Sequence, residues 1–207
     1  MAEAAQFAKP EFELTGGTLC LDFANTSDDH KAPETGGEEI HSYADLLAFG
    51  VQTGDLSIPD ARKLLNAANH SRAKADAVLR KAHQLREIIY RVFASAASEY
   101  RPSQEDIENL NGFLRDTLGH SRVVTKPRGY VRTWEDSESL ERPLWPIVES
   151  AVELLTSSEL KQIRECGAET CSWLFVDRSR NRTRRWCDMK VCGNRAKARR
   201  HYERVRG

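Results

Sequence analysis

The chain lacks any long apolar segment. No run of about 18 apolar residues, the length read as a membrane-spanning helix, occurs in its 207 residues. The first residues also lack an apolar core of signal-peptide length. We therefore expect a cytoplasmic protein with no membrane contact. Its length suffices for one ordinary domain and a small appendage.

The sequence also lacks the short motifs of common enzyme classes. It contains no Gly-rich phosphate loop, no H-E-x-x-H, and no Ser/His/Asp set that spacing singles out. Internal repeats and low-complexity tracts are missing as well. These absences favour a binding protein without catalytic residues over an enzyme.

The chain as a whole has no net charge, because 31 basic residues balance 31 acidic ones. Residues 161–207 hold 14 basic and 5 acidic residues, a balance of +9. Residues 1–160 therefore hold 17 basic and 26 acidic residues, a balance of −9. Such a split indicates two parts with different partners, and it predicts domains at 1–160 and 161–207.

Apolar spacing predicts that the first part is mainly helical. In the longest candidate helix, Leu85, Ile89 and Phe93 belong to a stripe that repeats at three and four residues. Ser103 with Asp106 resembles a capping box. The predicted helices span residues 43–53, 59–69, 72–100, 104–118 and 143–156, with a shorter one from Ser158.

Short strands complete the first part. Residues 11–26 are predicted as two strands around a Gly16-Gly17 turn, because apolar residues alternate with others between Leu19 and Ala24. A polar loop follows at residues 27–39. Residues 122–126 and 130–134 are β-rich runs around a Pro-Arg-Gly turn and predict a hairpin. Residues 1–160 are thus expected to form one α+β domain.

Cysteine is sparse, and four of the five cysteines gather near the C-terminus with the spacing C-x4-C-x15-C-x4-C. In a reducing cytosol this cluster indicates a metal site rather than two disulfides. Four thiolates suit one structural zinc ion with no open position, and zinc binding can drive the folding of a small module. The predicted ligands are Cys166, Cys171, Cys187 and Cys192.

Other interpretations of the cysteines stay open. The cluster could be a redox-active dithiol pair or a set of unliganded buried thiols. Cys20 stands alone and is predicted to pack in the N-terminal region. His201 could replace one cysteine, but its distance from Cys192 in the sequence favours a residue at the surface or facing DNA.

The 15 residues between the cysteine pairs predict a hairpin that brings the pairs together. Residues 172–177 (SWLFVD) are one candidate strand and residues 183–187 (TRRWC) the other, with the turn at residues 178–182. Trp173, Phe175 and Trp186 either pack the small core of the module or offer stacking surfaces to bases.

A basic helix is expected after the last cysteine, with Asn194 as its cap. Such a helix can lie in a groove of DNA or along phosphates, and guanidinium groups match phosphates and guanine edges bidentately. The alternative is a solvated face, or one that pairs with the acidic first part. The candidate nucleic-acid-binding residues are Arg184, Arg185, Asn194, Arg195, Lys197, Arg199 and Arg200.

The string C-D-M-K-V-C-G-N-R-A-K-A-R-R-H-Y at residues 187–202 closely resembles the CGNR zinc-finger family, which is named after the tetrad found here from Cys192 to Arg195. Residues 16–26, GGTLCLDFANT, resemble the opening of the ABATE domain, which usually precedes that finger. Together the resemblances cover nearly the whole chain. They imply a bacterial stress-induced transcription regulator, in which the finger binds DNA and the ABATE part senses a ligand.

The expected architecture is α+β, with a mainly helical ABATE-like domain followed by a small four-cysteine finger of hairpin and basic helix. The leading function is a transcription regulator that binds DNA through one structural zinc finger. An RNA- or ribosome-associated binder and a protein–protein adaptor are the alternatives. A homodimer would enlarge the footprint of one finger, although no heptad seam demands it.

A small-molecule ligand of the first part is a further expectation. Asp22, Asn25 and Thr26 end a predicted strand beside the polar loop, where their side chains could offer hydrogen bonds. His83, Arg86 and Trp134 are possible companions. Alternatively, Asp22 and Asn25 organise the turn.

Overall fold

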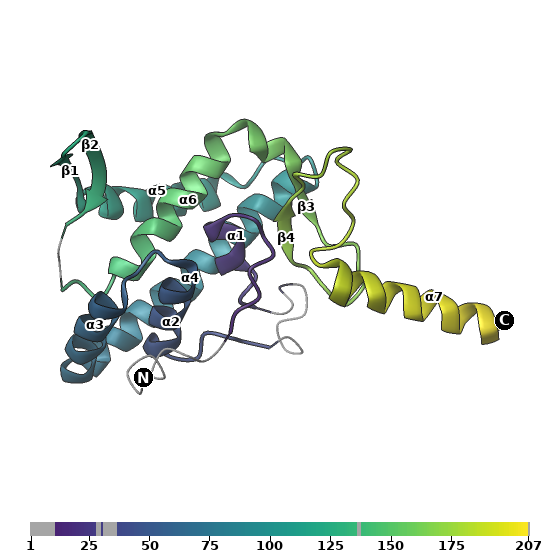
Figure 1. Ribbon diagram of the computed structural model, residues 1–207, viewed down its shortest axis with the longest axis horizontal. Coiled ribbons are helices and arrows are strands. Elements are labelled where there is room, and N and C mark those ends of the chain that lie inside the picture. The colour runs from purple at the N-terminus through teal and green to yellow at the C-terminus, as the bar shows by residue number, and fades with distance from the viewer. Residues whose placement is uncertain (1–10, 28–29, 31–36, 136–137, 207) are drawn as a thin grey trace.

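The structure is a computed structural model that describes residues 11–27, 30, 37–135 and 138–206, with the backbone alone at positions 200, 201 and 205 (Figure 1). Most of the body is helical. The helices are α1 (Leu19–Ala24), α2 (Tyr43–Thr53), α3 (Ile58–His70), α4 (Arg72–Ala97), α5 (Gln104–Leu118), α6 (Trp145–Thr156) and α7 (Asn194–Arg206). Two 3₁₀ turns, η2 (Arg142–Leu144) and η3 (Ser158–Gln162), flank α6, and the π-helical turn η4 (Met189–Gly193) precedes α7.

The strands form two antiparallel ribbons. β1 (Ser121–Lys126) pairs with β2 (Gly129–Trp134), and β3 (Ile163–Glu165) pairs with β4 (Leu174–Val176). The first ribbon is the predicted hairpin, and it stands out from the body in Figure 1. Helices together with two small ribbons confirm the predicted α+β class. Within the described residues, no helix combines the length and the apolar character needed to cross a membrane.

Local signals place the helix ends close to where the sequence predicts them. The Ser42 side chain accepts a hydrogen bond from the Asp45 N–H at the start of α2, and Gly54 ends that helix with a φ of 83°. At the start of α5 the Ser103 hydroxyl accepts from the Asp106 N–H. These bonds satisfy donors that a helix terminus leaves without partners, and glycine adopts the left-handed end at little cost.

Helix α4 is the centre of the body. It packs against α1, α2, α3 and α5 as well as the β3–β4 ribbon. Its stripe residues Leu85, Ile89 and Phe93 are fully buried, as the spacing predicts. Each such side chain contributes about 1.5–3 kcal/mol by leaving water, so this stripe carries much of the core.

Residues 19–24 form helix α1 and residues 11–15 form no strand, so both strands predicted around Gly16-Gly17 are wrong. The five residues from position 20 to 24 are all buried, which means that alternation along the chain marks no solvent face. A short apolar run does not distinguish a buried strand from a buried helix. The Gly16 N–H donates to the Asp22 carboxylate at 2.7 Å, and this contact holds the preceding turn against the helix.

Strand β4 joins two cores. Leu174 and Val176 pack into the main core with Ile163 of β3, whereas Phe175 packs with the cysteines. Successive residues of a strand point to opposite faces, so one short strand serves both sides. The zinc module is therefore attached to the helical body through its own hairpin.

Candidate zinc centre and nucleic-acid surface

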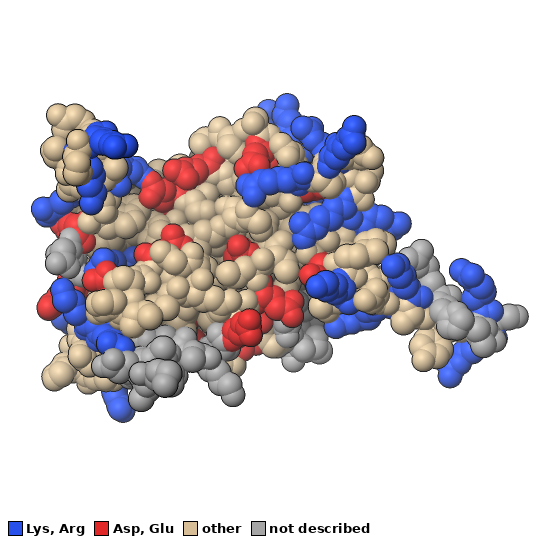
Figure 2. Space-filling model, in the orientation of Figure 1, with Lys and Arg blue, Asp and Glu red and all other residues tan. Residues whose placement is uncertain are grey.

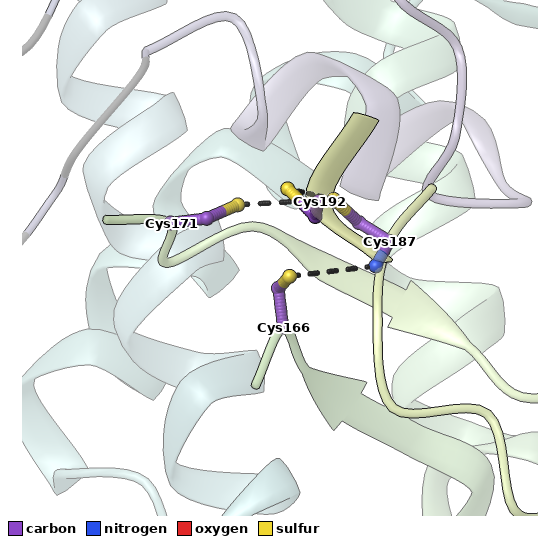
Figure 3. A group of neighbouring side chains, drawn as sticks. All are labelled: Cys166, Cys171, Cys187 and Cys192. Atoms are coloured by element: carbon purple, nitrogen blue, oxygen red, sulfur yellow. Dashed lines mark hydrogen bonds between the residues drawn. The ribbon is translucent and has the colours of Figure 1, made fainter. Parts of the chain in front are cut away.

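The four clustered cysteines bring their sulfur atoms to one point (Figure 3). Their Sγ atoms all lie within 4.8 Å of one another. The Sγ of Cys187 is 3.7 Å from that of Cys171 and 3.6 Å from that of Cys192. A tetrahedral zinc ion with Zn–S bonds of about 2.3 Å separates its sulfurs by about 3.8 Å. The geometry fits zinc, and the protein holds one structural zinc ion at this centre.

The electrostatics of the cluster also call for a cation. Hydrogen bonds from the neighbouring thiols of Cys171 and Cys187 lower the pKa of Cys166, while the contact with Cys166 raises the pKa of Cys187. Thiols this close cannot all ionise beside one another. A bound dication removes that conflict, because it is ligated by deprotonated cysteines.

Two strands and two turns position the ligands. Cys166 directly follows β3, Cys171 precedes β4, and Cys192 lies in η4. The Cys187 N–H points at the Cys166 sulfur, 3.5 Å away. The Asp188 carboxylate accepts from the N–H groups of Lys190 and Val191, so Asp188 caps the helical stretch that contains Cys192. The expected cap, Asn194, instead lies inside this continuous helical stretch, between η4 and α7.

The hairpin of the module is not the predicted one. β4 lies within the predicted first strand, but its partner is β3, which precedes the first cysteine. Residues 183–187 form no strand; the Arg184 N–H donates to the buried Asp177 carboxylate at 3.0 Å and the Arg185 carbonyl accepts from the Gly167 N–H at 2.7 Å. The loop ends at Cys187, one of the four clustered cysteines, and strand propensity does not reveal such a constraint.

The aromatic residues of the module mostly fill its core. Phe175 is fully buried and Trp173 is 7% exposed, and both pack against the cysteines. The Trp173 indole N–H donates to the Ser27 carbonyl at 3.0 Å. Neither ring can receive a base, so of the three proposed stacking residues only the half-buried Trp186 is left. Cys20 is fully buried beside Ser150 in the helical body and is not part of the metal cluster.

Helix α7 carries exposed basic residues away from the body (Figure 1). Asn194, Arg195, Lys197 and Arg199 are all exposed, while the side chain of Arg200 lies outside the described residues, as does that of His201. The Arg195 guanidinium contacts the Thr170 hydroxyl at 3.3 Å. Gly193 has little room beside it, because a Cβ there would lie 2.5 Å from the Met189 sulfur.

The two loop arginines proposed for nucleic acid differ. Arg184 is half-buried: its guanidinium donates to the carbonyls of Trp186 and Cys187 and lies 4.3 Å over the Phe175 ring. Arg185 is exposed and lies 5.6 Å over the Trp186 ring. The structure therefore gives Arg184 a role in holding the loop and leaves Arg185 at the surface.

On the face shown in Figure 2, basic side chains gather at the end that holds the zinc module and α7. Part of this charge is paired within the protein. Arg178 donates to both Glu159 oxygens, at 2.6 and 2.8 Å, and so ties the module to η3. Arg199 pairs with Glu169 and Glu203. Pairing with the acidic part is thus seen at Arg178 and not at the described arginines of α7.

The three proposed ligand-binding residues make internal contacts. The Asn25 side chain both donates to and accepts from the Leu174 backbone at 2.9 Å, which docks β4. Thr26 donates to the Phe23 carbonyl. Burial raises the pKa of Asp22 to about 6, although N–H groups of Gly16 and Gly17 partly offset this. Trp134 lies apart from them, at the end of β2. The centroid of its ring is 5.8 Å from that of Trp145.

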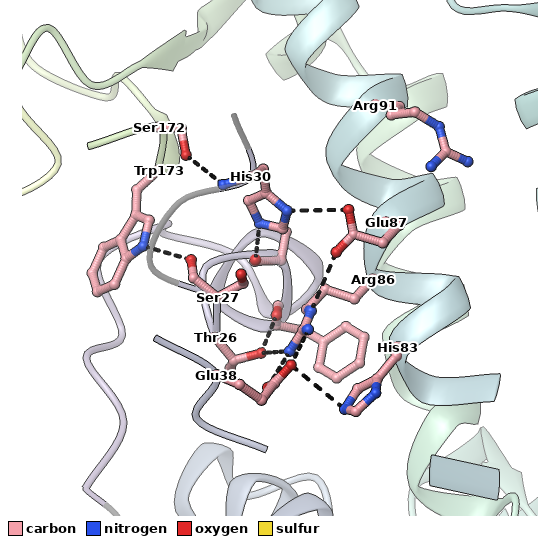
Figure 4. Close-up of polar contacts among 12 residues, drawn as sticks. Thr26, Ser27, His30, Glu38, His83, Arg86, Glu87, Arg91, Ser172 and Trp173 are labelled. Carbon is pink, nitrogen blue, oxygen red and sulfur yellow. Dashed lines mark hydrogen bonds and ion pairs between the residues drawn. The ribbon is translucent and has the colours of Figure 1, made fainter. Parts of the chain in front are cut away.

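His83 and Arg86, two of the possible companions, belong to a buried polar cluster on α4 whose acidic member, Glu38, the sequence did not single out (Figure 4). Arg86 is 4% exposed, and it donates to Thr26 at 3.2 Å and to both oxygens of Glu38. Burial alone would raise the pKa of Glu38, but the hydrogen bonds and charge of Arg86 lower it. His83 lies 3.7 Å from the Glu38 carboxylate. The signal in the sequence for this cluster is Arg86, a charged residue among the apolar positions of α4.

The same cluster reaches the zinc module. The His30 ring is stacked on Tyr90, and its nitrogens lie 2.7 Å from the Ala24 carbonyl and 3.3 Å from Glu87. The hydrogen bond from His30 lowers the pKa of Glu87. The His30 backbone N–H donates to the Ser172 hydroxyl, one residue after a zinc ligand. The cluster thus forms a continuous path from α4 to the finger.

The fold and the four-cysteine centre define a zinc-finger protein with a helical N-terminal domain. Comparison with known families agrees. Residues 17–158 match the ABATE family, described as "Putative stress-induced transcription regulator", and residues 162–205 match the CGNR zinc finger. The chain belongs to the ABATE family and carries a CGNR zinc finger, as the motifs predict. No curated protein matches the chain.

Proposed function

We propose that this protein is a transcription regulator that binds duplex DNA through the basic surface of its zinc finger. The observation that carries the proposal is the placement of α7: its helical stretch contains the zinc ligand Cys192, and the helix then extends from the body with Arg195 and Lys197 exposed. A basic helix fixed at one end loses little freedom on binding, so its charges can meet several phosphates at once.

The test compares two Arg-x-Lys pairs on helices. Arg195→Ala with Lys197→Ala removes the pair on α7, and Arg72→Ala with Lys74→Ala removes an exposed pair at the start of α4. Each phosphate contact contributes about −0.9 to the slope of log K against log salt. The α7 variant should flatten the slope on duplex DNA by about two, and the α4 variant should leave it unchanged. Equal slopes in all three proteins would contradict the proposal.

Other roles of the finger predict different results. An RNA- or ribosome-associated function requires that structured RNA displaces duplex DNA from the protein. An adaptor that docks on an acidic protein predicts weak DNA binding at low salt. We favour DNA, because two of the three aromatic residues proposed for base stacking, Trp173 and Phe175, are buried in the finger core. The proposal assigns no catalytic step, and it places the protein in the cytoplasm, where cysteines stay reduced for zinc.

We further propose that the N-terminal domain senses a small carboxylic acid, which takes the place of Glu38 on Arg86. The supporting observation is the bidentate contact of a buried arginine with a carboxylate that is itself 30% exposed. Arg86 is also bonded to Thr26, beside the segment that contacts Ser172 and Trp173 of the finger. Ligand exchange at Arg86 would thus act on the residues that follow Cys171.

Thermal unfolding of the whole chain with a set of small carboxylic acids tests this sensor role. An acid that binds should raise the melting temperature, and it should do so at lower concentration in Glu38→Gln, where the internal competitor has lost its charge. Glu105→Gln, at an exposed position of α5, is the control. If no acid raises the melting temperature of either protein, the sensor proposal is wrong.

A further inference from the structure

A groove of about 400 Å³ separates the first zinc loop from helix α7. The loop between Cys166 and Cys171 forms one wall, and α7 with the neighbouring Trp186 forms the other. Three arginines and two glutamates line it. The lining residues that matter for binding are Glu169, Thr170, Trp186, Arg195, Arg199 and Glu203.

Arg199 is engaged inside this groove by two carboxylates from different elements. Its Nη1 donates to Glu169 of the zinc loop, and its Nε donates to Glu203 at 3.0 Å, one helical turn further along α7. All three side chains are more than half exposed, with 51% for Arg199, 69% for Glu169 and 61% for Glu203. The pairing therefore lies in water, where ion pairs contribute little and exchange partners readily.

A guanidinium that accepts a carboxylate in this way also accepts a phosphate, because both present oxygens that match its N–H groups. Arg195 lies one turn before Arg199 on the same face of α7, and its guanidinium donates to the Thr170 hydroxyl at 3.3 Å. Glu169 thus stands where an approaching phosphate would meet Arg199. Its charge would also repel the DNA backbone.

We infer that Glu169 and Glu203 occupy the phosphate position on Arg199 in the free protein, so that a DNA backbone enters the groove by displacing them. This inference rests on the proposed DNA binding and adds the position of the strand and an internal competitor. The acidic pair weakens binding to all DNA and leaves a larger share of the selectivity to contacts with bases.

A double-mutant cycle on duplex DNA at low salt tests the inference. Glu169→Gln removes the competitor, and we expect DNA affinity to rise two- to fivefold, the range for releasing one exposed ion pair. Glu203→Gln should act in the same direction. In the Arg199→Ala background neither change should raise the affinity by more than Glu105→Gln does. Zinc content and circular dichroism confirm that each variant is folded.

The outcomes separate this inference from the proposed function. If the unmodified protein fails to bind duplex DNA at low salt, both the proposed function and this inference are wrong. If the protein binds DNA but Glu169→Gln changes nothing, the competitor role alone is wrong. If Glu169→Gln raises the DNA affinity equally with and without Arg199, the effect is one of general charge, and the inference is also overturned.

Discussion

At the scale of single residues, Arg184 and Arg185 are adjacent in the sequence and equal in charge, yet they have different surroundings. The guanidinium of Arg184 donates to backbone carbonyls of the finger loop and to that of Thr15 in the N-terminal segment, at 3.3 Å, and it covers Phe175. Arg185 is exposed over Trp186. Charge alone does not say which arginine serves the fold and which is available to a ligand.

Substitution by alanine should therefore affect stability at Arg184 and DNA binding at Arg185. Arg184→Ala leaves carbonyls without donors, and we expect a loss of about 1–3 kcal/mol in the free energy of unfolding together with faster zinc loss to a chelator. Arg185→Ala should keep stability within about 0.5 kcal/mol and weaken DNA binding. Urea unfolding and DNA titration of the two zinc-loaded variants measure these effects. A stable Arg184 variant would refute the structural role.

Asp22 gives the fold a dependence on pH. Burial raises the pKa of Asp22 from an ordinary 3.8 to about 6, so the folded protein binds this proton more tightly than the unfolded chain does. The stabilisation from Asp22 is fully present below about pH 4 and is lost as the pH rises through 6. At most about 3 kcal/mol is involved, at 1.36 kcal/mol for each pKa unit.

Asp22→Asn removes this titration. The difference in the free energy of unfolding between the unmodified protein and this variant should shift in favour of the variant between pH 4 and pH 7. Urea unfolding of both proteins at several pH values measures it, and the zinc ligands titrate in both and cancel. A difference that stays constant with pH would show that Asp22 is not the buried acid described here.

At the scale of elements, the turn before α1 connects the N-terminal segment with β4. The Gly16 N–H donates to Asp22, and its carbonyl accepts from the Val176 N–H at 2.9 Å. Gly17 adopts a φ of 82°, which favours glycine. A Cβ at Gly16 would lie 2.8 Å from the Leu21 Cβ and 2.9 Å from the Asp22 nitrogen. Backbone atoms cannot move aside as a flexible side chain can.

Gly16→Ala should therefore destabilise the protein by about 1–3 kcal/mol, because the turn has to shift away from α1 and β4. Gly112→Ala is the matched control: this glycine lies inside α5, where the nearest atom to a new Cβ is 3.9 Å away. The control should gain up to about 1 kcal/mol from helix propensity. Thermal unfolding compares the two, and equal effects would contradict the close contact at Gly16.

At the scale of the whole molecule, the zinc centre and the helical body share one hairpin but have separate cores. Ile163, Leu174 and Val176 belong to the main core, and the cysteines with Phe175 form the second. Loss of zinc removes the constraint on the loop and on α7. It leaves the apolar contacts of β3 and β4 with α4 in place.

Cys192→Ser should lower bound zinc from one ion per chain towards none, while most of the helical circular dichroism of α2 to α6 is retained. Cys20→Ala is the matched control, since Cys20 is buried in the body away from the cluster and should leave zinc at one ion per chain. Metal analysis after gel filtration gives the stoichiometry. Full zinc in the Cys192 variant, or a loss in the Cys20 variant, would show the ligand set to be wrong.

The sequence by itself determined the elements whose causes are local. Helices α2 and α5 begin at Ser42 and Ser103, because short polar side chains cap helices wherever they occur. The apolar stripe of α4 follows from the 3.6-residue period, and the zinc ligands follow from cysteine spacing. The C-G-N-R tetrad and the G-G-T-L-C-L-D-F-A-N-T string also sufficed to identify the family.

Only the tertiary structure decided what depends on distant neighbours. Residues 20–24 are all buried, so no solvent face gives this segment a period that distinguishes a helix from a strand. The partner of β4 is β3, while residues 183–187 form a loop that is bonded to Asp177 and Gly167. The roles of Arg184, Arg199 and Asn25 likewise depend on carbonyls and carboxylates that reach them only in the folded chain. Side-chain chemistry sets which partners a residue can accept, but the packing of remote segments sets which partner it meets.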